Sequence, residues 1–230
     1  MAHKTYPRSI QLGDLFEVIA DAIPNEPALI TNDVKFTYAE LDERITRLAN
    51  YLLSIGIKRG EHVGVHAQNT HEWVEAFYAC AKISAVAINV NYRYVAAELR
   101  YLYDNADCVA VIAEPEYLSA INDVRDALPN LRNVIVIGAE YEAALAAASP
   151  DRDFPGRTAD DVYVLYTGGT TGMPKGVMWR QGDALVECFG GSRTAASVDD
   201  FLAETKGRRA LVAPPFMHGA GHWVAFGSWN

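Results

Sequence analysis

Short apolar runs alternate along the chain with segments in which apolar residues recur every three or four positions. The runs predict buried strands, because they are continuous and rich in β-branched residues, and the spaced residues predict amphipathic helices. The predicted strands of the central region are 62–67, 85–90, 108–113 and 134–137. The helices predicted between them contain Trp73 to Tyr78, Leu99 to Tyr103 and Leu118 to Leu128. This alternation predicts an α/β fold with layers of parallel sheet and helices on the faces.

The first sixty residues carry signals for other elements. Apolar residues at helical spacing predict an amphipathic helix over 12–23. The segment 28–36 has the pattern of a β-hairpin with a tight turn. Thr37 and Glu40 have the spacing of a capping box, so a second long helix is expected to begin there and to end at Gly56.

A glycine- and threonine-rich loop is predicted at 166–177, after a buried strand that runs from residue 162. Glycines let the backbone come close to a ligand, threonine hydroxyls and backbone N–H groups donate to anionic oxygens, and a lysine adds positive charge. No acidic residue lies between Thr167 and Gly176. The loop therefore predicts a phosphate-binding site formed by Thr167, Gly168, Gly169, Thr170, Thr171, Gly172 and Lys175.

Two better-known phosphate motifs do not match this segment. The Walker A pattern needs a serine or threonine after its lysine, whereas Lys175 is followed by Gly176. The Gly-x-Gly-x-x-Gly pattern of dinucleotide-binding folds also fails. A flexible turn that binds nothing is the alternative interpretation of such a loop.

The segment from Ala213 to Trp223 is a second candidate for chemistry. A short strand is predicted at 210–213, and the two prolines that follow favour an extended chain. Small residues flank His218 and would let another molecule come close. A lone histidine in an apolar stretch is more often structural than catalytic, and this interpretation stays open.

A helix that begins near Gly219 would turn His218 and His222 to the same side. Two histidines at this spacing can bind a metal, but the carboxylate of the His-Glu-x-x-His motif is missing. We therefore favour the lining of a pocket and predict no metal-ligating residue.

Composition narrows the range of partners and compartments. The chain has 230 residues, half of them hydrophobic, and a net charge of −9, which argues against a nucleic-acid partner. Cys80, Cys108 and Cys188 form no Cys-x-x-Cys pair, so free thiols in a reducing cytoplasm are expected. The polar N-terminus does not resemble a signal peptide, and no apolar run approaches the roughly 20 residues of a membrane helix.

The segment 166–177 resembles the signature of the adenylate-forming enzymes, which include acyl-CoA synthetases, firefly luciferases and peptide-synthetase adenylation domains. Their loop reads Tyr-Thr-Ser-Gly-Thr-Thr-Gly-x-Pro-Lys-Gly-Val, and this chain departs from it at Gly168, where serine is usual. The change removes one hydroxyl donor and keeps the backbone donor. So many matches in order are far more specific than a lone glycine motif.

The resemblance extends to other segments. Residues 36–41 are similar to the family's Leu-Thr-Tyr-x-Glu-Leu motif, which has a structural role in either interpretation. Residues 81–86 and 89–93 are similar to its Leu-Lys-Ala-Gly-Ala and Asn-x-Arg segments, for which core packing is the expected role. In them, Ser84 stands where glycine is common and Asn89 where proline is common.

The histidine segment resembles the family's Pro-x-Phe-His-x-x-Gly motif, which lines the acyl pocket and the route of the CoA arm. Met217, not an aromatic residue, precedes His218 here, and Phe216 sits one place earlier. The resemblance implies that the substrate-binding residues are Phe216, Met217, His218 and Trp223.

The resemblance implies ATP-dependent activation of a carboxylic acid to an acyl adenylate, followed by thioester formation with CoA. Lys175 and His218 would be the catalytic residues, and Mg²⁺ would accompany the phosphates of ATP. The apolar stretch after residue 216 favours a fatty or otherwise bulky apolar acid. The alternatives are an adenylation enzyme that loads a carrier protein and a nucleotide-binding module without catalysis.

The resemblance also implies that residues 1–230 form only part of the large N-terminal AMP-binding domain. The adenine-binding segment, the acidic residue for magnesium, the ribose-binding aspartate, the hinge and the C-terminal domain with its catalytic lysine would follow Asn230. We expect this piece to fold around its own sheet, to bind ATP poorly and to form no acyl adenylate alone.

Overall fold

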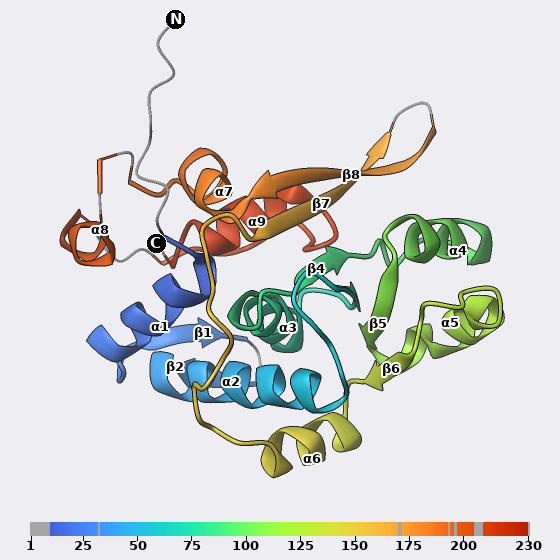
Figure 1. Cartoon of the computed structure of the whole chain (residues 1–230), viewed down its shortest axis with the longest axis horizontal. Helices are drawn as coiled ribbons and strands as arrows, with labels where there is room; N and C mark the ends of the chain where they lie inside the picture. The colour runs from blue at the N-terminus through green and yellow to red at the C-terminus, as the bar shows by residue number, and fades with distance from the viewer. Residues whose placement is uncertain are drawn as a thin grey trace, which may run out of the picture.

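Figure 1 shows the computed structural model of the chain. The residues that it describes are 10–31, 33–169, 172–192, 194–195, 197–204 and 209–229. Within these ranges the strands form one four-stranded parallel sheet and two antiparallel hairpins.

The parallel sheet has the strand order β4–β3–β5–β6. Its strands are β3 (His62–His66), β4 (Val86–Asn89), β5 (Cys108–Ala113) and β6 (Asn133–Val136). All neighbouring strands run in the same direction. Every residue of β5 is buried, as expected of a strand that is covered on both faces. The predicted parallel sheet is confirmed, and each predicted strand end lies within one residue of the observed one.

Helices cover both faces of the sheet and divide the core into two clusters. The helices are α1 (Leu12–Ala22), α2 (Tyr38–Ser54), α3 (His71–Lys82), α4 (Ala96–Asn105), α5 (Leu118–Arg125) and α6 (Ala139–Ala147), with a 3₁₀ turn η1 (Pro115–Tyr117). Helices α1, α2 and α3 pack in the cluster that contains Ala110 and Ile112 of β5. Helices α4 and α5 pack in the cluster that contains Val111 and Ala113. Alternate residues of one strand therefore contribute to opposite cores.

Local sequence signals account for the start and end of α2. The Thr37 hydroxyl accepts from the Glu40 N–H at 3.3 Å, and the Glu40 carboxylate accepts from the Thr37 N–H at 2.8 Å, so the predicted capping box is formed. Gly56 follows the helix with a φ of 86°, in the left-handed region where glycine commonly ends a helix. The predicted hairpin before α2 is also present, as β1 (Pro27–Ile30) and β2 (Lys35–Thr37).

The second hairpin corrects one prediction. β7 (Val162–Gly169) pairs antiparallel with β8 (Gly172–Arg180) and is not a strand of the parallel sheet. The segment 166–177 was expected to be a loop, but both strands continue through most of it. Antiparallel pairing accounts for this, because ladder bonds between the two segments satisfy the backbone groups of a glycine-rich stretch. Figure 1 shows β7 and β8 side by side, extending away from α7 toward the side of the molecule where α4 lies.

Other elements differ from the prediction in the last third of the chain. The strand expected at 210–213 is absent, since residues 209–213 have no regular secondary structure. Helix α9 (Gly219–Phe226) begins where a helix was expected. Three helices had no predicted counterpart: α6, α7 (Gln181–Glu187) and α8 (Val198–Glu204). The alanine-rich sequence of α6 favours a helix by propensity but has no apolar periodicity to reveal it.

The connector between α6 and β7, residues 148–161, has no helix or strand of its own. Side chains of the helical layer nevertheless hold it in place. The Asn50 amide donates to the carbonyls of Ser149 and Asp151 at 2.8 and 2.9 Å. Arg152 and Arg157 of the connector form ion pairs with acidic residues of α1 and α2. The connector is thus fixed against α1 and α2.

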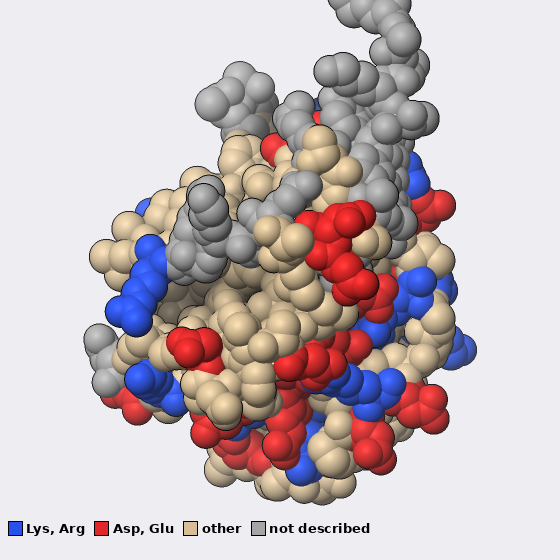
Figure 2. Space-filling model, turned by 90° about the vertical axis from the view of Figure 1, so that its left-hand side faces the viewer, with Lys and Arg blue, Asp and Glu red and all other residues tan. Residues whose placement is uncertain are grey.

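A buried charge network joins the first three helices. Lys82 is fully buried, and its Nζ donates to Glu17 at 2.8 Å, to Asp42 at 2.7 Å and to the Thr46 hydroxyl at 2.9 Å. Burial alone would raise the pKa of Glu17, but Arg157 and Lys82 outweigh it and lower that pKa. Figure 2 shows the face on which α1 lies, where acidic and basic side chains contact one another. A buried cation paired in this way ties the helices together.

Candidate functional site

The predicted phosphate-binding residues that the structure describes lie toward one end of the β7–β8 hairpin. In the antiparallel register, Thr167 of β7 is directly opposite Lys175 of β8. Directly opposed residues project from the same face, with their Cβ atoms about 5 Å apart. Both side chains are exposed. The fold therefore brings a hydroxyl donor and a cation together on one open surface.

The glycines of the hairpin have two different roles. A Cβ atom at Gly168 or Gly172 would meet no other atom within 4 Å, so the backbone there is open to a ligand. A Cβ atom at Gly176 would lie 2.9 Å from the ring of Tyr166, so that glycine is needed for packing of the ring. Gly169 ends β7. The remaining candidates, Thr170 and Thr171, lie outside the described residues.

Tyr166 anchors the hairpin just before the segment that is predicted to bind phosphate. Its N–H donates to Oδ1 of Asn89 at 2.8 Å, and its carbonyl accepts from Nδ2 of Asn89 at 2.9 Å. Its hydroxyl donates to Asn105 of α4 at 2.9 Å. Burial raises the pKa of Tyr166 to about 12, so the hydroxyl stays protonated and keeps donating.

The chain before His218 is held by Asn69, a residue that sequence reasoning missed. Nδ2 of Asn69 donates to the carbonyls of Val212 and Pro214 at 3.4 and 3.1 Å, and Oδ1 accepts from the N–H of Phe216 at 2.7 Å. Hydrogen bonds to one amide side chain thus hold this segment in place of the backbone hydrogen bonds of the strand expected at 210–213. No local pattern indicates this, because Asn69 lies more than 140 residues away in the sequence.

The four predicted substrate-binding residues divide into a buried and an exposed pair. Phe216 and Met217 are buried, and the ring of Phe216 stacks on Trp73 with 4.8 Å between centroids. His218 is exposed at the N-cap of α9, and the Trp223 side chain is 46% exposed. Only the second pair is accessible to another molecule in this structure.

Helix α9 begins against β7. A Cβ atom at Gly219 would lie 2.6 Å from Cδ2 of Leu165, so only glycine allows this approach without a shift. The Met217 carbonyl accepts from Nδ2 of Asn89 at 2.8 Å, and the same nitrogen donates to Tyr166. The histidine segment and the strand that carries the predicted phosphate-binding residues are therefore neighbours, as a single site requires.

His222 does not line a pocket with His218, as the spacing had suggested. It is 1% exposed, and its two ring nitrogens lie 2.8 Å from the Tyr163 hydroxyl and 2.7 Å from the Phe216 carbonyl. Burial lowers the pKa of His222 to about 3, so the ring is neutral near pH 7. The predicted helix is present, but only His222 faces the core.

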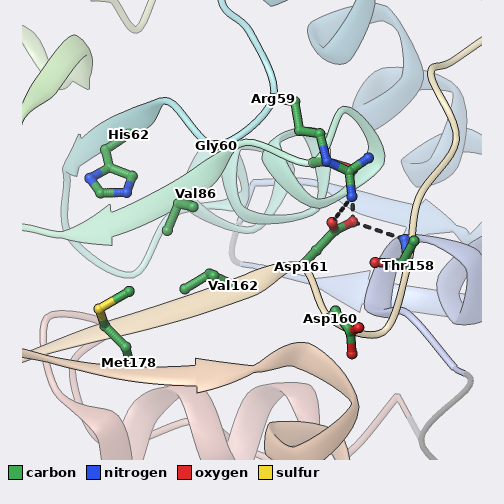
Figure 3. A pocket seen from close by; sticks show the side chains of 10 residues that line it. Arg59, Gly60, His62, Val86, Thr158, Asp160, Asp161, Val162 and Met178 are labelled. Atoms are coloured by element: carbon green, nitrogen blue, oxygen red, sulfur yellow. Dashed lines mark hydrogen bonds and ion pairs between the residues drawn. The ribbon is translucent and has the colours of Figure 1, made fainter.

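A cavity of about 370 Å³ opens at the other end of the hairpin (Figure 3). Val86, Val162 and Met178 form its apolar lining. At one side, Asp161 pairs with Arg59 and accepts from the N–H of Thr158. These polar groups are bonded to one another, and the cavity lies away from Thr167 and Lys175.

Two further findings concern the described residues alone. No cluster of three or more His, Cys, Asp or Glu side chains within them has the arrangement of a metal site. None of the helices that they form combines the length and apolar character needed to cross a membrane.

The parallel sheet, the β7–β8 hairpin and the segment before α9 all lie within the part of the chain that matches a known family of enzymes. The chain belongs to the family of AMP-binding enzymes, which it matches over residues 16–229. The resemblance to adenylate-forming enzymes is thereby confirmed.

Individual relatives agree with this membership. The chain is 43% identical to the 3-oxocholest-4-en-26-oate–CoA ligase of Rhodococcus rhodochrous, over 96% of this chain and 43% of the relative. It is 39% identical to a medium/long-chain-fatty-acid–CoA/3-oxocholest-4-en-26-oate–CoA ligase of Mycobacterium tuberculosis (strain ATCC 25618 / H37Rv), over 92% of this chain and 42% of the relative. The chain therefore spans less than half the length of these curated relatives.

The fold is similar to that of solved structures. The inhibitor-bound N-terminal domain of FACL13 from Mycobacterium tuberculosis superposes with a TM-score of 0.79, at 25% identity, over 95% of this chain and 55% of that chain. The putative long-chain-fatty-acid CoA ligase from Rhodopseudomonas palustris gives a TM-score of 0.78 at 25% identity, over 96% of this chain and 56% of that chain. The predicted fold class is therefore confirmed as that of an acyl-CoA ligase N-terminal domain.

Proposed function

We propose that the full-length protein activates a bulky, largely apolar carboxylic acid with ATP, as an acyl adenylate, and transfers the acyl group to CoA. The observation that carries this proposal is the pairing of Thr167 with Lys175 on an exposed surface, together with the bonds from Asn89 to Tyr166 and Met217, the residues that precede Thr167 and His218. Family membership and the names of the relatives support it.

The reaction needs a site that stabilises negative charge on a leaving group. A carboxylate is a poor acyl donor, so it attacks the α-phosphorus of ATP, and pyrophosphate leaves. The Thr167 hydroxyl, the backbone amides around Gly168 and Gly172, and the Lys175 ammonium would hold the β- and γ-phosphates. Donors fixed before the reaction stabilise the charge that develops on the pyrophosphate.

The second half-reaction is attack of the CoA thiol on the adenylate, with AMP as the leaving group. His218 and Trp223 would lie beside the acyl group and the CoA arm, because they are the exposed members of the histidine segment. A large apolar acid, such as a fatty acid or a steroid side-chain acid, matches the names of the relatives. An apolar surface that includes Trp223 and Val224 supports this class of acid.

The proposal also includes magnesium as a companion of ATP and the cytoplasm as the compartment. Magnesium would enter with ATP as part of the substrate, bound by the phosphates. The acidic residue that would help to hold magnesium is expected, from the family resemblance, to follow Asn230. Cys80, Cys108 and Cys188 are free thiols, which suits a reducing cytoplasm.

Trapping of the acyl adenylate tests the proposal. The full-length protein should form an acyl hydroxamate from hydroxylamine, ATP and a medium- or long-chain fatty acid or a steroid side-chain acid. Thioester should then form with CoA. If the adenylate forms but the acyl group is transferred only to a carrier domain, the acceptor is a carrier protein and not CoA. No pyrophosphate release with any of these acids would contradict the proposed activity and favour a nucleotide-binding module.

A further inference from the structure

Strands β4 and β7 lie side by side without a shared backbone ladder. In the described part of the chain, β4 is an edge strand of the parallel sheet and β7 pairs with β8. Side chains at the two ends of β4 join the strands: Ser84 donates to Asp161 at 2.7 Å, and Asn89 bonds to Tyr166. Both pairs are 77 residues apart in sequence, so β4 and β7 run in the same direction in one register.

The space between the two strands is not filled next to the Ser84–Asp161 contact, whereas nearer Asn89 the side chains of Ile88, Val164 and Tyr166 pack in one buried cluster. The cavity of about 370 Å³ opens between Val86 of β4 and Val162 of β7, as Figure 3 shows. Apolar packing between the strands is therefore interrupted along part of their length. The two polar contacts therefore add directional alignment of the hairpin with the sheet to the apolar packing that remains.

Asn89 also bonds to the segment that precedes α9. Its side chain is buried, and it makes three hydrogen bonds: Nδ2 donates to the carbonyls of Tyr166 and Met217, and Oδ1 accepts from the Tyr166 N–H. The opposite orientation of the amide would place Oδ1 against two carbonyl oxygens, so the contacts define the orientation. Tyr166 immediately precedes Thr167, and Met217 immediately precedes His218.

We propose that Asn89 is a positioning residue for both half-reactions, because its amide fixes the phosphate-binding end of β7 relative to the segment that carries His218. This inference rests on the proposed function. Asn89 contacts no substrate, and it acts through the backbone of Tyr166 and Met217. The distance between the ATP phosphates and the acyl group then depends on this buried amide as well as on the Tyr163–His222 bond between β7 and α9.

Ser84 supports the same alignment from the far end of β4. Its φ of 57° lies in the left-handed region, which is unfavourable for serine and natural for glycine. The bond from its hydroxyl to Asp161 offsets that backbone cost. Ser84 and Asn89 are the positions at which the sequence departs from the family's glycine and proline. Neither of those residues has a side chain that could make these bonds.

The test compares Asn89→Asp with Asn50→Asp in the full-length protein. Asn50 is a matched control, because its amide also donates to two backbone carbonyls but holds the connector instead of the site. Adenylate formation and thioester formation from preformed adenylate should each fall at least tenfold per folded molecule in Asn89→Asp. The change should be mainly in kcat, with a smaller change in KM for ATP. Asn50→Asp should change neither half-reaction more than twofold.

Hydrogen exchange gives a readout that does not depend on activity. Peptides containing Tyr166 and Met217 should both exchange at least fivefold faster in Asn89→Asp, whereas peptides from β3 and β5 should not change. Asn89→Ser, which keeps one donor, is the second variant in case the aspartate prevents folding, and the same paired effect is expected. Loss of only one half-reaction, or exchange that rises equally throughout the chain, would overturn the positioning role. A wild-type protein without adenylate formation would instead reject the proposed function, while the exchange data would still decide whether Asn89 joins the two segments.

Discussion

The hydroxyl of Tyr163 donates a 2.8 Å hydrogen bond to Nδ1 of His222, and this bond joins β7 to α9 inside the aromatic core. The direction of the bond follows from the other ring nitrogen. Nε2 of His222 faces the Phe216 carbonyl at 2.7 Å and must carry the proton, since a carbonyl only accepts. Both ring nitrogens are therefore used by a neutral imidazole.

This arrangement predicts a loss of stability as the pH falls from about 7 toward 5. Unfolded histidine titrates near about 6.5, and burial lowers the pKa of His222 to about 3 in the folded chain. Between these two pKa values the unfolded state binds more protons than the folded state. The contribution of His222 to the free energy of unfolding is therefore fully present above the unfolded pKa and decreases as the pH falls below it. For each such histidine, the free energy of unfolding can change by at most about 1.4 kcal/mol per pH unit.

Urea unfolding at several pH values between 5 and 7.5 checks this prediction. His222→Gln should reduce the slope of stability against pH without abolishing it, because burial also lowers the pKa of His66, to about 4. Tyr163→Phe is the control, and it should cost about 1–3 kcal/mol at every pH while most of the slope remains. Equal slopes in the wild type and His222→Gln would contradict the assignment.

Lys175→Ala in the full-length protein should weaken the use of ATP. A charge-assisted contact to phosphate is worth about 1.5–3 kcal/mol, so kcat/KM for ATP should fall roughly ten- to a hundredfold. Thr167→Ala should act in the same direction, since Thr167 is opposite Lys175. Lys58→Ala, a change of an exposed lysine outside the hairpin, serves as the control. ATP kinetics that match the control in both variants would remove these residues from the site.

His218→Ala should alter chemistry without loss of folding. The side chain is exposed and makes no capping hydrogen bond to α9, so stability should change by no more than about 0.5 kcal/mol. Thioester formation or the preference among acids should change. A thermal melt combined with both half-reactions measures this, and a large fall in melting temperature with unchanged rates would assign His218 a structural role.

Gly221→Ala tests the packing of α9, because helix propensity and packing predict changes in stability of opposite sign. Helix propensity alone would make the alanine more stable by about 1 kcal/mol. A Cβ atom at Gly221 would, however, lie 2.5 Å from the Pro215 carbonyl oxygen, which belongs to the backbone and cannot rotate away. We expect a net loss of about 1–3 kcal/mol. Gly156→Ala, where a Cβ atom meets nothing within 4 Å, is the control, and a more stable Gly221→Ala protein would contradict the packing.

Lys82→Met should be strongly destabilising. Removal of the cation takes one partner from each of the buried carboxylates of Glu17 and Asp42, which keep Arg157 and Arg152, and breaking such a buried pair typically costs about 3–5 kcal/mol. Because the network lowers the pKa of Glu17, its contribution is present above the unfolded pKa and is lost as the pH falls through the folded one. Chemical unfolding at pH 7 measures the first effect, with Lys58→Met as a surface control. A loss under about 1 kcal/mol would place the network among weak surface pairs.

Sequence reasoning found the elements whose signals are local. The strands of the parallel sheet were predicted because each is a short apolar run, and α2 because Thr37 and Glu40 form its cap. The signature around Lys175 indicated the family, since its information lies in the order of neighbouring residues. Periodicity and capping act within one turn or one strand, so they remain visible in a single sequence.

The parts that were missed depend on contacts between distant residues. Asn69 replaces the strand that was expected before His218, and Asn89 joins segments that lie 77 and 128 residues farther along the chain. The difference between His218 and His222 likewise follows from Tyr163 and Phe216, which bond to only one of the two. A pattern of residue types cannot reveal which distant backbone group an amide or imidazole will meet.

The connector of residues 148–161 has a consequence for how the chain can be cut or rearranged. Stretches without helix or strand are where proteases usually nick a protein and where new termini or inserted domains are tolerated. Here Asn50, Arg152 and Arg157 bind the stretch to α1 and α2, so opening it would also uncover charges buried around Lys82. This connector is thus a poor place for a nick or a circular permutation, although it has no helix or strand of its own.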